Sequence, residues 1–335
     1  MSPSNSILVF LTVASLVAFS TALGDQVHEA AKNGDIETLR SLIEGGADVD
    51  SKDELGRTPL HFAKDWAVAE LLITLGANVN AKDRSDTTPL HYAPDAETAE
   101  LLLSRGARVD ARNTINYTPL HDAGGKDAAV AALLITHGAD VNARDHSENT
   151  PLHLVDSAAA AEVLIAHGAD VHAVNEFGAT PLHWAYDPAM VDVLIKHGAD
   201  VNARSNDGHT VLHDTVNTYV DFDKPPVIDR LLAHGADVNA RDNNGQTPLH
   251  YARQREVALV LIAHGADINA QDDDRSTPMD MARRRGYGPV ISLLAERGAQ
   301  GRNPVRDIGI PVLATGLVTS ILLFIFLRLM GRARE

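Results

Sequence analysis

Residues 56–83 read GRTPLHFAKDWAVAELLITLGANVNAKD, and most of this 335-residue chain repeats that stretch. The Thr-Pro-Leu-His segment returns with few changes at intervals of 30, 30, 32, 30, 30, 37 and 30 residues. Its copies begin at Thr58, Thr88, Thr118, Thr150, Thr180, Thr210, Thr247 and Thr277. A second marker, a glycine before Ala-Asp-Val-Asn-Ala or a close variant, keeps the same spacing from Gly46 to Gly265. Two markers that share one period predict a repeat architecture.

Each repeat predicts two short helices. Thr58 suits a helix N-cap and Pro59 the first helical position, so Thr-Pro begins the first helix. An apolar stripe at helical spacing, such as Val68 with Leu71 and Leu72, marks the second helix. Its expected N-caps are Asp65, Asp95, Asp156 and Asp187. The marker glycine, Gly76 in this copy, ends the second helix because glycine easily takes the left-handed conformation. The polar residues that follow predict a turn back to the next Thr-Pro.

A single helix pair of this length cannot enclose a hydrophobic core. The apolar stripe of one pair must be covered by the next pair along the chain. The pattern therefore predicts a stack in which each repeat contacts mainly its neighbours.

These motifs resemble the ankyrin repeats, whose signature is TPLH, a helix pair, a leucine run and GADVNA. The resemblance covers residues 25–300 and implies an all-α solenoid of about nine units. Ankyrin units usually have 33 residues, whereas most intervals here are 30. The difference falls between the two helices, where the family usually has a Gly-His turn. Only residues 32–35 and 284–287 keep a similar turn, so the first and last units are expected to be end caps.

The N-terminal residues 1–24 contain an uncharged apolar run of signal-peptide length. Small residues after it provide cleavage points behind Ala22 or Gly24. No lysine or arginine precedes the run, whereas signal peptides normally begin with positive charge. We expect a cleaved signal peptide, with an uncleaved N-terminal anchor as the alternative.

Near the C-terminus, residues 308–327 form a twenty-residue stretch without charge, long enough to cross a bilayer as a helix. Residues 301–307 would be a juxtamembrane linker, and residues 328–335 a basic tail. Arginines flank the stretch on both sides, so counting them gives no orientation. The expected signal peptide gives the orientation. It predicts a single-pass membrane protein with the repeats outside the cytoplasm and the tail within.

The amino-acid composition argues against several classes of function. A formal charge of −16 argues against general nucleic-acid binding, and the absence of cysteine excludes disulfides and thiolate chemistry. Twelve of the sixteen histidines follow the repeat: seven in the Thr-x-Leu-His motif and five before the marker glycine. Neither set has the close spacing of a zinc site. The resemblance implies that the motif histidines hydrogen-bond within and between repeats. We predict no catalytic residues, no metal site, no cofactor and no small-molecule substrate.

Aromatic residues are the best candidates for a binding surface. Four of them, Phe62, Tyr92, Trp184 and Tyr251, directly follow the motif histidine. Core packing is the competing interpretation of that position. Aromatic anchors on the inner helices would instead suit a protein interface. In ankyrin proteins partners usually lie against hairpin tips and inner helices. That resemblance adds residues at the hairpin tips and inner helices to the candidates: Ile115, Tyr117, His146, Glu176, Phe177, Asn206 and His209.

We therefore expect a membrane-anchored, non-catalytic ankyrin scaffold that binds a protein partner on its concave face. One alternative is a cytoplasm-facing membrane adaptor, or a secreted effector, with an uncleaved N-terminal anchor. A second is a metal-binding or enzymatic protein that uses the histidine rows. Stoichiometric metal in the purified protein would favour that second alternative.

Overall fold

A computed structural model describes residues 23–123, 128–218 and 224–301. The expected signal peptide therefore lies outside the described residues apart from positions 23 and 24. Of the expected linker, only position 301 is described. The 308–327 segment and the basic tail lie wholly outside the described residues. Within the described ranges, no helix is both long and apolar enough to cross a membrane.

Helices dominate the described residues, with one isolated antiparallel bridge between Arg204 and Thr210. Residues 23–33 are helical and precede the labelled elements. The first helices of the repeats that follow are η1 (Pro59–Phe62), η2 (Pro89–Tyr92), α5 (Pro119–Ala123), α7 (Pro151–Leu154), η3 (Pro181–Trp184), α10 (Val211–Asn217), α12 (Pro248–Tyr251) and α14 (Pro278–Arg285). The second helices are α2 (Ile36–Glu44), α3 (Trp66–Thr74), α4 (Ala96–Ser104), α6 (Ala128–Thr136), α8 (Ala158–Ala166), α9 (Pro188–Lys196), α11 (Lys224–Ala233), α13 (Arg255–Ala263) and α15 (Gly288–Glu296). The described chain thus holds nine helix pairs, the number expected from the sequence.

The helix starts follow the predicted capping chemistry at most positions. Thr58 is the N-cap of η1 with Pro59 at the first position, and the Asp65 carboxylate accepts from the Val68 N–H at 3.1 Å. Asp95 and Asp187 cap α4 and α9 in the same way. The prediction of Asp156 was wrong by one residue. The N-cap of α8 is Ser157, whose hydroxyl accepts from the Ala160 N–H at 3.1 Å.

The marker glycines end the second helices as expected. Gly76 has φ 99°, and its equivalents from Gly46 to Gly265 have φ between 88° and 99°, the left-handed region that favours glycine. The first and last repeats keep a glycine between their helices as well. Gly34 and Gly286 have φ of 78° and 76°, and Gly286 is the C-cap of α14.

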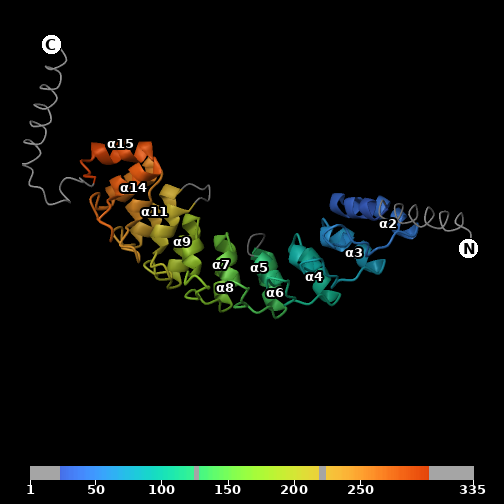
Figure 1. The fold of residues 1–335 in the computed structure, drawn as a ribbon. Coiled ribbons are helices and arrows are strands. Elements are labelled where there is room, and N and C mark those ends of the chain that lie inside the picture. The colour runs from blue at the N-terminus through green and yellow to red at the C-terminus, as the bar shows by residue number, and fades with distance from the viewer. Residues whose placement is uncertain (1–22, 124–127, 219–223, 302–335) are drawn as a thin grey trace, which may run out of the picture. The chain divides into compact units, whose positions relative to one another are not determined.

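The chain divides into two compact units. The N-terminal unit comprises Met1–Val211 with Ala233–Ala236, and the C-terminal unit comprises Leu212–Leu232 with Asp237–Glu335. In the N-terminal unit, α3, α4, α6 and α8 pack side by side in chain order (Figure 1). In the C-terminal unit, α12 packs on α14 and α13 on α15.

The core of the N-terminal unit contains a row of leucines, one from each of α3, α4, α6, α8 and α9. Leu72, Leu102, Leu134, Leu164 and Leu194 are each at most 1 % exposed. Burying one such side chain contributes roughly 1.5–3 kcal/mol. Because each leucine is covered by neighbouring repeats, the row confirms that the apolar stripe needs the stack. Leu212, Ile228, Leu249 and Leu261 belong to the core of the C-terminal unit.

Candidate functional site

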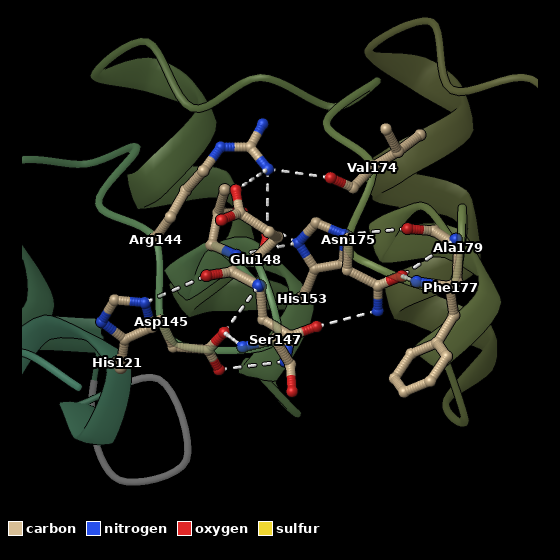
Figure 2. A network of polar contacts seen from close by, with 12 residues as sticks. His121, Arg144, Asp145, Ser147, Glu148, His153, Val174, Asn175, Phe177 and Ala179 are labelled. Carbon is tan, nitrogen blue, oxygen red and sulfur yellow. Dashed lines mark hydrogen bonds and ion pairs between the residues drawn. The ribbon is translucent and has the colours of Figure 1, made fainter. Parts of the chain in front are cut away.

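In seven of the hairpins that precede a first helix, one acidic or amide side chain holds the turn. In the hairpin of Asp145, the carboxylate oxygen Oδ1 accepts from the N–H groups of Ser147 and Asn149, both at 2.8 Å (Figure 2). Asn175 does the same with Phe177 and Ala179, both at 3.0 Å. Asp53, Asp83, Asn113, Asp242 and Asp272 are equivalent. These bonds satisfy two main-chain N–H groups of each hairpin, so the other side chains at the tip are not needed to hold the turn.

Neighbouring tips of the N-terminal unit are joined through their main chains. The N–H of Arg84 donates to the Leu55 carbonyl at 2.8 Å, and the N–H of His146 donates to the Ile115 carbonyl at 3.0 Å. Thr114 to Ser85, Glu176 to Ser147 and Asn206 to Phe177 continue the same pattern. Leu55, Ser85, Ile115, Ser147 and Phe177 are therefore held in one row.

The motif histidines connect each repeat to the next. At His153, the Thr150 N–H donates to Nδ1 at 3.1 Å, so Nδ1 is an acceptor and Nε2 carries the proton. The Nε2–H then donates to the carbonyl of Ala179 in the following repeat at 3.1 Å (Figure 2). The neutral ring thus fills both of its hydrogen-bonding roles. Burial lowers the pKa of His153 to about 4.

This inter-repeat bond recurs along the chain. The other motif histidines, His61, His91, His121, His183, His213 and His250, direct Nε2 to a main-chain carbonyl of the next repeat at 3.0–3.5 Å. The role implied by the ankyrin resemblance is therefore confirmed. His28 was missed by the sequence reasoning because no Thr-Pro-Leu precedes it, yet its Nε2 reaches the Arg57 carbonyl at 2.9 Å in the same way.

The five histidines before the marker glycines lie at second-helix ends. His197 and His234 approach carboxylates of the preceding repeat, Glu162 and Asp192, at 2.8 and 2.7 Å. Across the described residues, no group of three or more histidine and acidic side chains is arranged to hold a metal ion. The histidine rows thus take part in contacts between repeats.

Three of the candidate aromatic side chains are exposed on the N-terminal unit. Phe177 at a hairpin tip is 57 % exposed, and Tyr92 and Trp184, at the ends of η2 and η3, are 41 % and 42 % exposed. The tips also expose Leu55 and Ile115. Leu55 was missed, although its position three residues before Thr58 matches that of Ile115 before Thr118. Apolar side chains held at the surface in this way suit contact with another macromolecule.

Other candidates are partly engaged within the protein. Phe62 is half-buried under the Arg57 guanidinium, 4.3 Å from the ring centroid. Tyr117 is half-buried and stacks on His121 with 5.3 Å between ring centroids. His146 is exposed and His209 is half-buried.

Tyr251 differs from the other candidates because it is buried. It lies in the C-terminal unit, is 7 % exposed, and donates from its hydroxyl to Asp242 at 2.6 Å. Burial, together with this hydrogen bond, raises the pKa of the phenol well above its ordinary value. Core packing, the competing interpretation of this repeat position, describes Tyr251 best. It is not part of the surface proposed below.

Comparison with known proteins gives the following matches. The model for ankyrin repeats (3 copies) matches residues 27–113, 154–222 and 216–304, and the model for a single ankyrin repeat matches residues 116–146. The chain is also similar to acyl-CoA-binding domain-containing protein 1 of Arabidopsis thaliana, with 44 % identity over 52 residues. That match covers 15 % of this chain and 15 % of the relative.

Proposed function

Because this chain belongs to the ankyrin repeat family, we propose that it is a non-catalytic scaffold that binds a protein partner through its N-terminal unit. The binding surface, called the tip surface below, consists of Leu55, Tyr92, Ile115, Phe177 and Trp184, with His146 beside them in the tip row. Ankyrin repeats serve protein–protein interaction, and this surface is where the chain exposes large apolar side chains on tips and first helices.

The exposure of these side chains carries the proposal. Phe177 and Trp184 keep 57 % and 42 % of their surface in water although each belongs to a hydrogen-bonded hairpin or helix. Two N–H groups of the hairpin, those of Phe177 and Ala179, already donate to the Asn175 side chain. The fold therefore gains little from an aromatic side chain at position 177. Covering large aromatic surfaces is what dominates binding energy at protein interfaces.

Site-specific photo-crosslinking in cells tests the tip surface. A photoreactive phenylalanine analogue placed at position 177 or 184 should give the same discrete crosslinked species. Position 196 is the matched control, because Lys196 lies in the same repeat on α9 and its side chain is 66 % exposed. Adding Phe177→Ser to the chain labelled at position 184 should sharply lower the yield. Equal crosslinking of one species from position 196 would exclude the tip surface.

We also propose that residues 308–327 anchor the protein in a membrane, with the repeats on the exported side. This part rests on the sequence alone: an uncharged stretch of twenty residues and an N-terminal segment that resembles a signal peptide. Protease added to cells with the outer barrier opened should then digest the repeats, and the mature chain should begin near Leu23 or Asp25. Protection of the repeats would favour the cytoplasm-facing adaptor instead.

A further inference from the structure

A groove on the second-helix side of the N-terminal unit is unrelated to the hairpin tips. It has a volume of about 560 Å³ and lies where the start of α3 meets α4. The groove is shallow and open to solvent. Its lining residues are Trp66 from α3 and Ala96, Glu97, Glu100, Leu101 and Ser104 from α4.

Trp66 is unusual for its position in the repeat. It is the first residue of α3, and the corresponding first residues of α4, α6 and α8 are Ala96, Ala128 and Ala158. Alanine therefore suffices to begin this helix. The indole is 46 % exposed, and no cation lies over its ring within the described residues. A free tryptophan face is the strongest cation–π partner among the side chains.

Two of the residues that α4 contributes to the lining are glutamates. Glu97 is exposed and makes no ion pair with any described residue. Glu100 is 53 % exposed, and its one ion-pair contact among the described residues is with His137, with 3.5 Å from Oε2 to Nε2. Glu97 and Glu100 are three residues apart on one helix, so they lie on the same face and repel each other until a cation joins them.

We propose that this groove binds an arginine or lysine side chain in a basic peptide segment of a partner protein. The cation would lie between the Trp66 ring and the carboxylates of Glu97 and Glu100. Leu101 and Ala96 would contact the aliphatic part of the side chain. An aromatic face opposite two carboxylates complements a cation with an apolar stem, which explains why the groove combines these residue types. The inference is independent of the tip surface, since the two share no residue.

Tryptophan fluorescence gives a direct test, because the chain contains two tryptophans and Trp184→Phe leaves Trp66 as the single reporter. The full-length protein is titrated with a capped peptide of five Arg-Gly pairs, and separately with the matched Glu-Gly peptide. The arginine peptide should change the Trp66 emission saturably, whereas the glutamate peptide should leave it unchanged. The converse variant, Trp66→Phe, should give no saturable signal from Trp184.

Charge removal decides between this site and general attraction to an acidic protein. Glu97→Gln combined with Glu100→Gln should weaken arginine-peptide binding by about tenfold or more. Glu37→Gln is the control, since Glu37 occupies the first turn of α2 as Glu97 occupies that of α4, and it should leave affinity unchanged. An absent Trp66 response, or equal weakening by the control, would overturn the proposal. Circular dichroism of each variant verifies that the fold persists.

Discussion

Acidification should loosen the histidine contacts between repeats, and His153 gives the size of the effect. The ring is 2 % exposed and has its pKa lowered from 6.5 to about 4 by burial. In the unfolded chain the same imidazole takes a proton near its ordinary value. Between these two values the unfolded state binds more protons, so stability is fully present above pH 6.5 and falls as pH falls toward 4.

The magnitude follows from the size of the shift. Between pH 6.5 and pH 5, a span of about 1.5 pH units, the unfolded imidazole is largely protonated and the folded one is not. Each pH unit of this span lowers the free energy of unfolding by about 1.4 kcal/mol. The loss attributable to His153 is therefore about 2 kcal/mol at pH 5. Burial also lowers the pKa values of His61, His121 and His250, so their contacts should weaken in the same direction.

Comparison of wild type with His153→Gln isolates this one titration, since all other groups are common to both chains. Hydrogen exchange measured by mass spectrometry on the full-length protein gives the local opening free energy of the peptide around Thr150. Glutamine does not titrate, so the stability advantage of wild type at pH 7.5 should shrink by about 2 kcal/mol at pH 5. An advantage that stays constant to within about 0.5 kcal/mol would refute the linkage argument.

Three substitutions test other features of the fold by thermal or urea denaturation. Ser157→Ala should cost about 1 kcal/mol because it removes the N-cap of α8, whereas Asp156→Ala next to it should cost almost nothing; the opposite order would mean that Asp156 is the cap. Gly178→Ala should cost more than about 2 kcal/mol, since φ is 72° and a Cβ would stand 2.8 Å from the main-chain nitrogen of Asn206; a neutral result would contradict this close approach. Arg275→Gly should stabilise by about 0.5–1 kcal/mol, because a left-handed residue costs about 1–2 kcal/mol, less the flexibility cost of glycine; destabilisation would show that the Arg275 side chain makes a needed contact.

Local rules explain why much of the fold was predictable. The Thr-Pro helix starts and the glycine helix ends depend on two or three adjacent residues, and Thr58, Pro59 and Gly76 are found in the predicted roles. Neighbouring residues in the sequence do not decide whether Asp156 or Ser157 is the N-cap of α8. Both side chains can cap a helix, and the register of α8 is fixed by which of its residues become buried.

The candidate surface was harder to predict, because exposure depends on the neighbouring repeat. Tyr92 and Tyr251 have the same residue type and the same repeat position, yet they are 41 % and 7 % exposed. The Tyr251 hydroxyl is 2.6 Å from Asp242, and the Arg285 guanidinium of the next repeat lies 5.7 Å from its ring centroid. The Tyr92 hydroxyl is 3.5 Å from Asp83, the hairpin carboxylate that corresponds to Asp242. No pattern within one repeat distinguishes the two tyrosines.

In the histidine hydrogen bond between repeats, the acceptor is a main-chain carbonyl oxygen. This has an evolutionary consequence. The residues that supply this carbonyl are all different: Arg57, Thr87, Tyr117, Asn149, Ala179, His209, Gln246 and Ser276. Every amino acid offers the same carbonyl, so a repeat can be duplicated, lost or exchanged by recombination without a compensating mutation in its neighbour. The side chain at that position, next to the hairpin tip, is free to diverge, and recognition can change while the joint is inherited intact.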